Sequence, residues 1–242
     1  ALNQKERKQL RHFFFNWGNL ALRSLRPGGH IFLASNTFLS QLVFSSLVES
    51  GLEFRGTVMR LVRTLRGGDR PKNAEKIYRD VCSLPRGCFE PWGLFRKPLP
   101  KGMKLSDCLK EYQTGGLRRK QTGGPFEDVI ESERTPKEER RIANHPSLKP
   151  QSFLRKIVYA SLPLGEGIVV DPFMGSGSTI AAAEAVDYPG IGVERYDEYF
   201  EMAKEAIERL SAIHTEDFEI TKRAVEKLSA IHTEESQLNL FN

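Results

Sequence analysis

The sequence has no long hydrophobic run and no targeting signal. None of its apolar stretches reaches the roughly 18 residues that a membrane-spanning helix needs. Residues 1–11 are polar and basic, unlike the apolar core of a secretory signal peptide. We therefore expect a soluble, cytoplasmic protein without a membrane partner.

Cysteine is scarce. Cys82, Cys88 and Cys108 are the only three cysteines in 242 residues, and their spacings are 6 and 20. These spacings fit neither a zinc-binding framework nor the paired cysteines of a secreted disulfide-rich domain. We expect reduced thiols that act as structural side chains, and no metal site.

Two nucleotide-binding fingerprints are also missing. The sequence contains neither a G-x-G-x-x-G dinucleotide motif nor a G-x-x-x-x-G-K-S/T phosphate loop. Their absence disfavours a nucleotide-dependent oxidoreductase and a P-loop protein.

The net charge of +5 is distributed unevenly. Residues 55–120 contain 17 Lys or Arg against 6 Asp or Glu, a net charge of +11, whereas residues 194–242 contain 6 against 12, a net charge of −6. Segregated positive charge is what a protein that neutralises phosphates requires. The basic segment therefore predicts contact with a polyanion, and a solvated basic face is the alternative.

Hydrophobic periodicity indicates an α/β protein. In the first part of the chain it predicts a helix over 13–25 ended by Pro27-Gly28-Gly29, a buried strand over 30–34, a helix over 40–49, and a strand or strand pair over 53–64. In the later part it predicts a helix over 151–162, a buried strand over 167–170, a helix over 178–186, a strand over 191–193 and a helix over 199–210. The 39% of hydrophobic residues suit one compact domain with a smaller inserted or appended module.

Residues 66–140 differ in character, because Gly, Pro and basic residues dominate there and apolar periodicity fades. Five aromatic residues are spread among the Arg and Lys of this segment: Phe89, Trp92, Phe95, Tyr112 and Phe126. Aromatic faces can stack on exposed bases and Arg can grip guanine edges or phosphates. The segment is therefore predicted to be an irregular module that contacts nucleic acid. For any single aromatic, a place in a small core is the favoured alternative.

Residues 211–242 are predicted to form a helical tail. Residues 207–216 nearly repeat as 225–234, a displacement of 18 residues or close to five helical turns. A local duplication is the expected explanation. His214 and His232 are expected to be exposed, a shared metal being the alternative. The apolar strip at 237–241 is expected to fold back on the core, with partner docking as the alternative.

A strand that ends in an acid, followed by a glycine loop that opens a helix, predicts a site for an adenosine-containing ligand. Gly175 and Gly177 allow the backbone to approach a ligand closely, and N–H groups at the start of the next helix can meet a carboxylate. Glu194 follows Asp171 by 23 residues, at the end of the next strand. A carboxylate there can accept hydrogen bonds from two ribose hydroxyls.

The glycine loop itself narrows the ligand class. Asp171-Pro172-Phe173-Met174-Gly175-Ser176-Gly177-Ser178 resembles the D-P-F-x-G-S-G-T signature of S-adenosylmethionine-dependent DNA methyltransferases that modify exocyclic amino groups; only Ser178 departs, replacing Thr. His145-Pro146-Ser147-Leu148-Lys149-Pro150, beginning 26 residues before Asp171, resembles the family's H-P-x-x-K-P element, which helps to hold the methionine end of the cofactor. The match extends over residues 144–210 and includes Glu194 and Tyr199.

The resemblance implies a Rossmann-like methyltransferase fold, circularly permuted and incomplete at its N-terminus. It implies S-adenosylmethionine as the cofactor, bound by His145, Pro146, Ser147, Lys149, Pro150, Asp171, Pro172, Phe173, Gly175, Ser176, Gly177, Ser178 and Glu194. The implied organisation is the second half of the core sheet in 1–65, a basic target-recognition module in 66–140, the cofactor-binding part of the core in 141–210, and the tail in 211–242.

The implied function is methylation of adenine N6 or cytosine N4 in double-stranded DNA, as in restriction–modification. The family holds the flipped base with a loop of one polar residue, two prolines and an aromatic, yet no Pro-Pro dipeptide occurs in this sequence. In the permuted order that loop precedes the helix at 13–25, so we expect it upstream of Ala1 and assign no catalytic residue. Glu90-Pro91-Trp92-Gly93 is the nearest imitation; it has one proline fewer and belongs to the basic module, so we do not expect it to be catalytic.

Other functions stay open at this point. A non-catalytic DNA-binding remnant, or one subunit of a split enzyme, would keep the basic module; its partners would be a chain that supplies the catalytic segment or a restriction endonuclease. An RNA or protein methyltransferase would keep the cofactor site and change the substrate. The choice between adenine and cytosine and the recognition sequence depend on residues that the motifs do not include.

Overall fold

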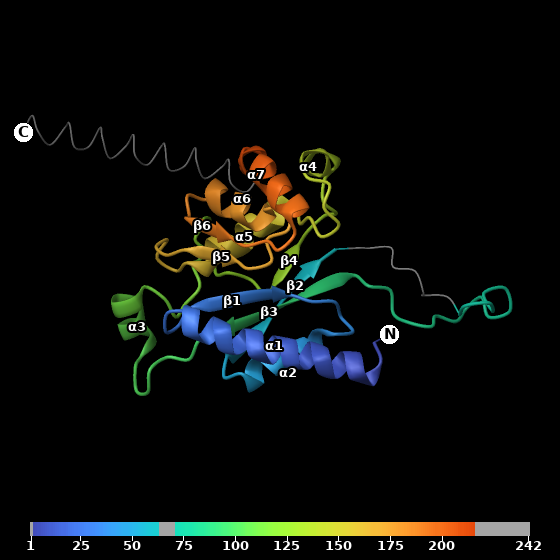
Figure 1. The fold of residues 1–242 in the computed structure, drawn as a ribbon, viewed down its shortest axis with the longest axis horizontal. Coiled ribbons are helices and arrows are strands. Elements are labelled where there is room, and N and C mark those ends of the chain that lie inside the picture. Colours follow the sequence, from blue (N-terminus) through green and yellow to red (C-terminus); the bar gives the residue numbers. More distant parts are fainter. Residues whose placement is uncertain (1, 63–70, 216–242) are drawn as a thin grey trace, which may run out of the picture.

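The computed structural model describes residues 2–62 and 71–215. Its elements in chain order are α1 (Gln4–Ser24), β1 (His30–Ala34), α2 (Ser40–Glu49), β2 (Glu53–Leu61), β3 (Phe89–Arg96), α3 (Leu105–Tyr112), β4 (Val129–Glu131), α4 (Lys137–Ile142), α5 (Gln151–Ser161), β5 (Val169–Asp171), α6 (Ser178–Ala185), β6 (Gly190–Gly192) and α7 (Asp197–Ser211). Figure 1 shows α1 and α2 on one side of the strands and α5, α6 and α7 on the other. The architecture is α/β, as the sequence predicts.

Four strands form the larger sheet, in the order β1-β3-β2-β4. β3 is antiparallel to β1 and β2, whereas β2 and β4 run parallel. Successive side chains of a strand point to opposite faces. Accordingly, Trp92 of β3 packs against Phe153 of α5, while Phe95 belongs to a second cluster with Leu47 of α2. Both faces of this sheet are therefore covered by helices.

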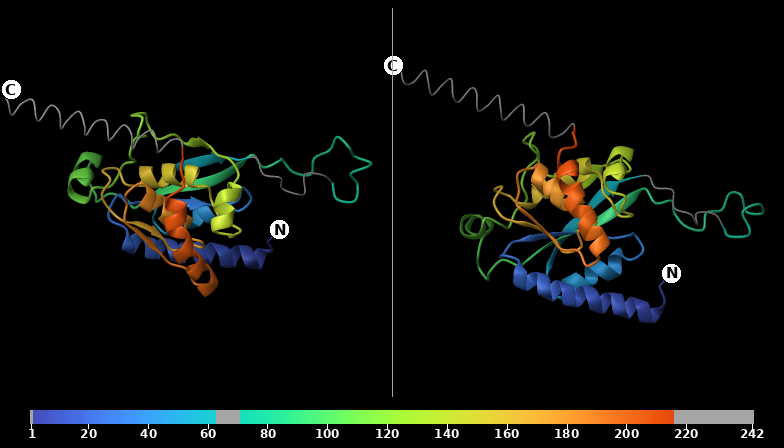
Figure 2. Two further views of the ribbon diagram at one scale, coloured as in Figure 1. Left: turned by 90° about the horizontal axis from the view of Figure 1, so that it is seen from above. Right: turned by 45° about the horizontal axis from the view of Figure 1, so that its top comes forward.

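The helices of the later part of the chain are packed through small side chains. Ala182 and Ala183 of α6 lie in the same core cluster as Phe153 of α5, and Ala181 of α6 packs with Ala206 of α7. Because alanine has no side chain beyond Cβ, α6 approaches both neighbouring helices closely. α5 thus joins the four-stranded sheet to the α6–α7 pair, as the two views in Figure 2 also show.

β5 and β6 form a separate, parallel two-stranded sheet. Among the described residues, β5 pairs only with β6, and β1 pairs only with β3. The predicted strand over 167–170 forms from Val169 onward, but the prediction that it is buried is wrong, since Ile168 is 56% and Val170 57% exposed. The physical reason is that successive side chains point to opposite faces: Val169 packs against the core cluster around Phe153, whereas Ile168 and Val170 lie on the other face.

β3 lies inside the segment predicted to be irregular, and that prediction is wrong for residues 89–96. Proline is disfavoured inside a sheet, because it cannot donate a ladder hydrogen bond. In the structure Pro91 lies opposite Met59, and the Met59 N–H donates to the Asp128 carbonyl on the β4 side at 2.6 Å. No bond to β2 is required at Pro91, so proline is tolerated in a central strand.

Most predicted elements coincide with observed ones. β1 and α2 have the predicted bounds, and α5 and α6 end one residue before theirs. α1 begins nine residues earlier than predicted because Asn3 and Glu6 form a capping box, in which each side chain accepts a hydrogen bond from the other residue's N–H, at 2.9 and 2.7 Å. α3 and α4 were not predicted.

Several predictions fall on residues outside the described part of the chain. These are the end of the strand predicted over 53–64, the second copy of the repeat at 225–234, His232 and the strip at 237–241.

The scarce residue types behave as follows. The cysteines are all free thiols, but only Cys108 is buried, so the prediction of structural thiols is wrong for the exposed Cys82 and Cys88. Trp92 and Phe95 are buried, which confirms the core alternative for these aromatics.

Across 2–62 and 71–215, no group of three or more potential metal ligands occurs. No helix within those ranges is long and apolar enough to cross a membrane.

Candidate functional site

The glycine loop, residues 171–178, leaves the carboxyl end of β5 and enters α6. Its start is fixed to β6 by backbone hydrogen bonds: the Val193 N–H donates to the Asp171 carbonyl at 2.9 Å, and the Met174 N–H donates to the Val193 carbonyl at 3.1 Å. The Asp171 carboxylate accepts a hydrogen bond from the Phe173 N–H at 3.0 Å. A carboxylate has about four acceptor positions, so Asp171 is held at the strand end with acceptor capacity to spare.

Gly175 and Gly177 both have left-handed backbone conformations, with φ of +54° and +80°. A Cβ on Gly175 would lie 2.8 Å from the His145 ring, and one on Gly177 would lie 2.6 Å from Ile207 of α7. The sequence predicts that these glycines allow a ligand to approach the backbone closely. The structure shows that they also let the loop pack against two protein side chains.

Glu194 is bound to the glycine loop through backbone N–H groups. Its Oε2 accepts from Gly175 at 3.0 Å, and its Oε1 accepts from Arg195 at 2.8 Å and Tyr196 at 2.9 Å. These bonds, that from Tyr196 first, lower the pKa of Glu194 and keep it ionised at neutral pH. They occupy about three of its four acceptor positions, which leaves capacity for about one further donor rather than the two ribose hydroxyls predicted.

Residues 145–150, here called the H-P loop, lie against the glycine loop. The His145 ring packs edge-on against Tyr199 of α7, with 4.5 Å between the ring centroids. Burial lowers the pKa of His145, which fits the neutral ring that its Nδ1 needs in order to accept a hydrogen bond from the Ser147 N–H at 3.2 Å. Pro150 is buried and forms the N-cap of α5.

A buried polar cluster lies beneath the two loops. The Gln151 amide nitrogen donates to the Ser178 carbonyl at 2.9 Å, which joins the start of α5 to the start of α6. The buried Glu139 carboxylate accepts from the Gln151 backbone N–H at 3.1 and 3.2 Å. Within the described residues, three buried polar atoms have no hydrogen-bond partner: Gln151 Oε1, Arg155 Nε and Ser176 Oγ. Unsatisfied buried groups are costly, and Ser176 lies in the glycine loop itself.

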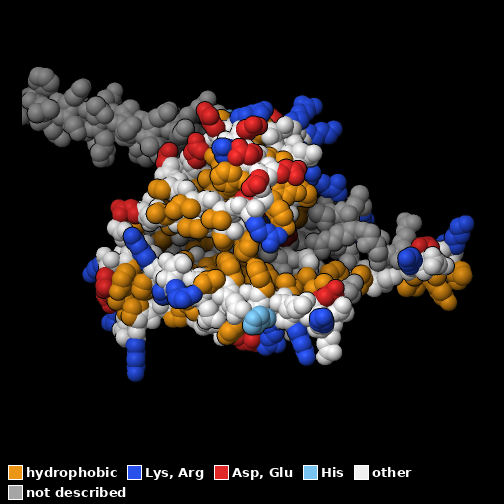
Figure 3. All heavy atoms as spheres, viewed as in Figure 1, with side chains coloured by type: hydrophobic (Ala, Val, Ile, Leu, Met, Phe, Trp, Pro, Cys, Tyr) orange, Lys and Arg blue, Asp and Glu red, His pale blue; other side chains and the backbone are white. Residues whose placement is uncertain are grey.

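One side of the site is apolar. Phe173 is 53% exposed, and its ring lies 6.3 Å from Phe13 and 6.0 Å from Trp17 of α1 between centroids. Figure 3 shows hydrophobic side chains gathered across the middle of this face, over β5 and the adjoining part of α1. The sequence predicts a helix over 13–25 that includes Phe13 and Trp17, but no motif indicates that they contact the glycine loop.

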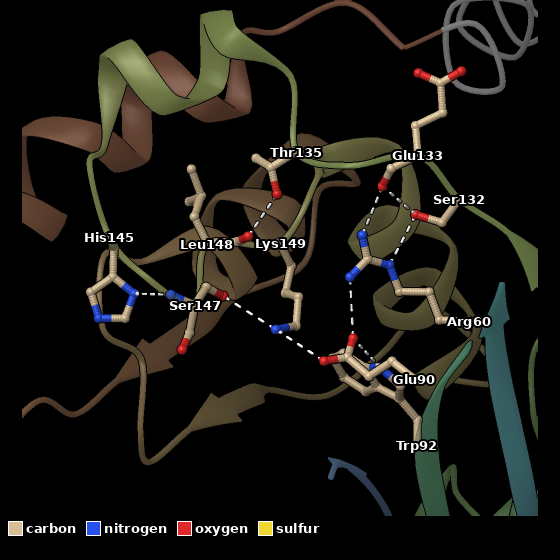
Figure 4. A network of polar contacts seen from close by, with 10 residues as sticks. All are labelled: Arg60, Glu90, Trp92, Ser132, Glu133, Thr135, His145, Ser147, Leu148 and Lys149. Atoms are coloured by element: carbon tan, nitrogen blue, oxygen red, sulfur yellow. Dashed lines mark hydrogen bonds and ion pairs between the residues drawn. The ribbon is translucent and has the colours of Figure 1, made fainter. Parts of the chain in front are cut away.

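The predicted cofactor-binding residues therefore do not all have the same surroundings. Pro146, Ser147, Pro172 and Phe173 are exposed, Asp171, His145, Lys149 and Glu194 are half-buried, and Pro150, Gly175, Ser176, Gly177 and Ser178 are buried. Lys149 points toward Glu90 of the four-stranded sheet, with which it forms an ion pair at 3.2 Å (Figure 4). The sequence offered no signal for this ion pair.

Glu90-Pro91-Trp92-Gly93 imitates the missing catalytic tetrapeptide. The sequence places it in the basic module, which is one reason for not expecting it to be catalytic. That placement is wrong, since the tetrapeptide lies at the start of β3 in the core sheet. Glu90 is engaged by Arg60 and Lys149, and Trp92 is buried against α5. The tetrapeptide is a packed part of the sheet.

Comparison with known protein families matches residues 3–205 to the N6/N4 methyltransferase family, described as DNA methylase. The type II methyltransferase M.HindIII of Haemophilus influenzae is 26% identical over 220 residues, which cover 83% of this chain and 70% of the relative. The type II methyltransferase M2.DpnII of Streptococcus pneumoniae is 34% identical over 86 residues, 36% of this chain. That alignment spans only 32% of the relative's length, less than two thirds.

Solved structures show the same fold. The PvuII DNA methyltransferase, a cytosine-N4-specific enzyme, superposes with a TM-score of 0.61 at 13% identity and covers 92% of this chain and 78% of that one. The M1.HpyAVI–SAM complex superposes with a TM-score of 0.55 at 18% identity and covers 81% and 83%. The fold is the Rossmann-like methyltransferase fold that the glycine loop predicts. Since the family match covers most of the described residues, the chain belongs to the N6/N4 DNA methylase family.

Proposed function

We propose that this chain binds S-adenosylmethionine at the glycine loop, the H-P loop and Glu194, and that it serves the methylation of adenine N6 or cytosine N4 in double-stranded DNA. One observation carries the proposal: Gly175 joins the three segments. Its N–H donates to Glu194 at 3.0 Å, and its missing side chain admits the His145 ring. The family match, and the fact that M1.HpyAVI was solved as a complex with SAM, support S-adenosylmethionine as the ligand.

The residues present fit such a cofactor. Asp171 and Glu194 offer carboxylate oxygens at the ends of adjacent parallel strands, where an adenosine ligand binds in open α/β sheets. Ser176 offers a buried hydroxyl without a partner in the described chain. In this proposal Glu194 accepts a ribose hydroxyl, Asp171 accepts a second donor of the ligand, and the H-P loop bounds the methionine end. Bound S-adenosylmethionine supplies a methyl group on a positively charged sulfur.

We propose that the loop presenting the base comes from outside these 242 residues. The sequence contains no Pro-Pro-aromatic tetrapeptide, and its nearest imitation is packed into β3. The exposed second edge of β5 and the apolar face beside it are consistent with a further segment at that place. The same absence supports a second candidate function, a subunit of a split methyltransferase that binds cofactor and DNA. The cofactor site is common to both.

We propose that the basic segment contacts double-stranded DNA through residues 71–88, which extend away from the body of the molecule (Figure 1). Lys72, Lys76, Arg79 and Arg86 are exposed there. Contacts to phosphates make affinity fall steeply with salt. We expect Lys76→Ala with Arg79→Ala to weaken duplex binding and to reduce the salt slope, whereas Lys5→Ala with Lys8→Ala on α1 leaves both unchanged. Equal affinities of the two double variants would contradict this assignment.

Calorimetric titration of the folded chain with S-adenosylmethionine tests the cofactor site. We expect saturable binding by the parent, and at least about tenfold weaker binding by Asp171→Ala and by Glu194→Ala, because a hydrogen bond to a charged group is worth about 1.5–3 kcal/mol. Glu198→Ala, which removes an exposed carboxylate at the start of α7, is the matched control. Circular dichroism establishes that each variant is folded. Failure of the folded parent to bind at millimolar ligand would contradict the proposal.

Methylation assays then test whether the base-presenting loop comes from outside these 242 residues. A segment carrying Pro-Pro-aromatic, added in trans, is expected to give duplex methylation that this chain alone does not give. Methylation by the 242 residues alone would contradict the proposed outside origin of the base-presenting loop.

A further inference from the structure

A buried ionic network joins the four-stranded sheet to the H-P loop (Figure 4). At its centre, Glu90 of β3 accepts hydrogen bonds on Oε2 from Arg60 of β2 at 3.1 Å and from the Trp92 indole at 3.2 Å. Its other oxygen pairs with Lys149 at 3.2 Å. All three charged side chains are largely buried, at 7% exposed for Arg60, 20% for Glu90 and 19% for Lys149.

Each of the three guanidinium nitrogens of Arg60 donates a hydrogen bond. Its Nε donates to the Ser132 hydroxyl at 2.9 Å and its Nη2 donates to the Glu133 carbonyl at 2.8 Å. Its guanidinium lies over the Phe153 ring of α5, 5.1 Å from the centroid. Although burial opposes it, the charges of Lys149 and Arg60 hold the pKa of Glu90 below its usual value. Glu90 is therefore a fixed negative charge on a rigid strand.

From Glu90 the contacts continue to the candidate cofactor site. Lys149 Nζ also donates to the Ser147 carbonyl at 3.4 Å, within the H-P loop. Ser147 donates its N–H to His145, whose ring lies 2.8 Å from the position that a Cβ on Gly175 would take in the glycine loop. A charge on β3 is thus connected to the glycine loop through three residues of the H-P loop.

We infer that Glu90 is a positioning residue, which anchors Lys149 and thereby holds the H-P loop against the glycine loop. This inference rests on the proposed binding of S-adenosylmethionine. It also assigns a different role to Lys149, which acts by fixing the loop and not by touching the cofactor. Removing one partner of a buried ion pair leaves the other charge buried and unpaired, which is strongly destabilising. Removal of either Glu90 or Lys149 is therefore expected to release the same loop.

A double-mutant cycle on the full chain tests the inference, with S-adenosylmethionine affinity as the readout. Lys149→Met keeps the apolar stem and leaves Glu90 paired with Arg60 and Trp92. We expect Lys149→Met and Glu90→Gln each to weaken binding roughly tenfold, and the double variant to weaken it by about the same tenfold and not a hundredfold. Lys149→Arg, which keeps the charge, is expected to restore most of the affinity.

Glu53→Gln is the matched control. Glu53 of β2 also forms an ion pair across the sheet, since its Oε2 lies 2.6 Å from Nη2 of Arg96 in β3. Arg96, however, donates to the Gly115 carbonyl, which lies outside the H-P loop. We expect this variant to lose stability without losing affinity. The inference is overturned if Glu90→Gln behaves like Glu53→Gln while Lys149→Met alone weakens binding, because Lys149 then contacts the cofactor directly.

Hydrogen exchange provides a readout that needs no cofactor. The Ser147 and Leu148 N–H groups donate to the His145 side chain and carbonyl at 3.2 and 3.1 Å. Both amides are expected to exchange faster in Glu90→Gln and Lys149→Met than in the parent or Glu53→Gln. If the parent fails to bind S-adenosylmethionine, the proposed function falls, and these exchange rates still decide whether Glu90 holds the loop. Unchanged rates in both variants would overturn the inference.

Discussion

The four-stranded sheet and the β5–β6 pair both contain apolar side chains, but they differ in how those side chains are covered. The first has helices on both faces, and two ion pairs join its strands, Arg60–Glu90 and Arg96–Glu53. The second exposes valine and isoleucine and ends in the glycine loop, where Ser176 Oγ has no partner among the described residues. The larger sheet is therefore a covered scaffold, whereas we propose that the exposed side chains of β5 and β6 and the Ser176 hydroxyl meet a ligand and a further segment.

The comparison predicts its largest effect in the scaffold. Phe95→Ala removes a fully buried ring between α2 and the sheet, and we expect a loss of about 3–5 kcal/mol in the free energy of unfolding. Urea unfolding measures it. Phe38→Ala makes the same chemical change at a side chain that is 59% exposed, and it is expected to cost less than about 1 kcal/mol. Equal losses would break the comparison.

The next effect belongs to the glycine loop. Gly175→Ala forces a side chain into a left-handed position and against the His145 ring, so we expect a stability loss of about 1–3 kcal/mol together with weaker cofactor binding. Gly102→Ala is the control, since its φ of +81° carries a similar backbone strain and no atom lies within 4 Å of the added Cβ. Calorimetric titration should show reduced affinity for Gly175→Ala alone.

The third effect depends on pH. Burial raises the pKa of Glu139 to about 7, against hydrogen bonding by Gln151 and the charge of Arg155. Because the folded protein holds this proton where the unfolded chain has lost it, Glu139 contributes stability that is complete below its unfolded pKa near 4.5 and is lost as pH rises through about 7. The loss is at most about 1.4 kcal/mol per pH unit.

Glu139→Gln isolates this contribution. We expect the stability difference between parent and variant, from urea unfolding at pH 5, 6, 7 and 8, to move against the parent up to about pH 7 and to level off above it. His30, whose pKa burial lowers to about 4, titrates in both proteins and cancels. A difference that is constant across this range would refute the assignment.

The smallest effect is expected at the exposed strand. Val170→Thr changes a side chain that is 57% exposed, so the free energy of unfolding should change by less than about 0.5 kcal/mol. The matched change Val58→Thr in β2, at a side chain that is 2% exposed, is expected to cost about 1–3 kcal/mol because it buries a hydroxyl. Similar losses would show that β5 is covered as fully as the scaffold.

Sequence reasoning succeeded where local pattern determines structure. The apolar periodicity of α2 and α5 is a local signal and gave the α/β class, and the Gly175-Ser176-Gly177 motif gave a loop between a strand and a helix, where the structure has β5 and α6. It failed at β3, because tolerance of Pro91 depends on which side of a strand the neighbour's N–H points.

The sequence also gave no indication of the Glu90–Lys149 ion pair or the contact of Phe173 with α1. Each joins residues at least 59 positions apart, and only the tertiary packing brings them together. Neither contact can be predicted from charge runs or motifs. The exposure of β5 was missed for a related reason, since an apolar strand is buried only if another element covers it.

We propose that S-adenosylmethionine binds where the glycine loop, the H-P loop and Glu194 meet. The most direct measurement is amide chemical-shift mapping by NMR during titration of the 242-residue chain with S-adenosylmethionine. We predict saturable shifts concentrated in residues 145–150, 171–178 and 192–196, with the amides of 89–96 in the scaffold little changed. Absence of saturable shifts, or shifts centred on the four-stranded sheet, would contradict the claim.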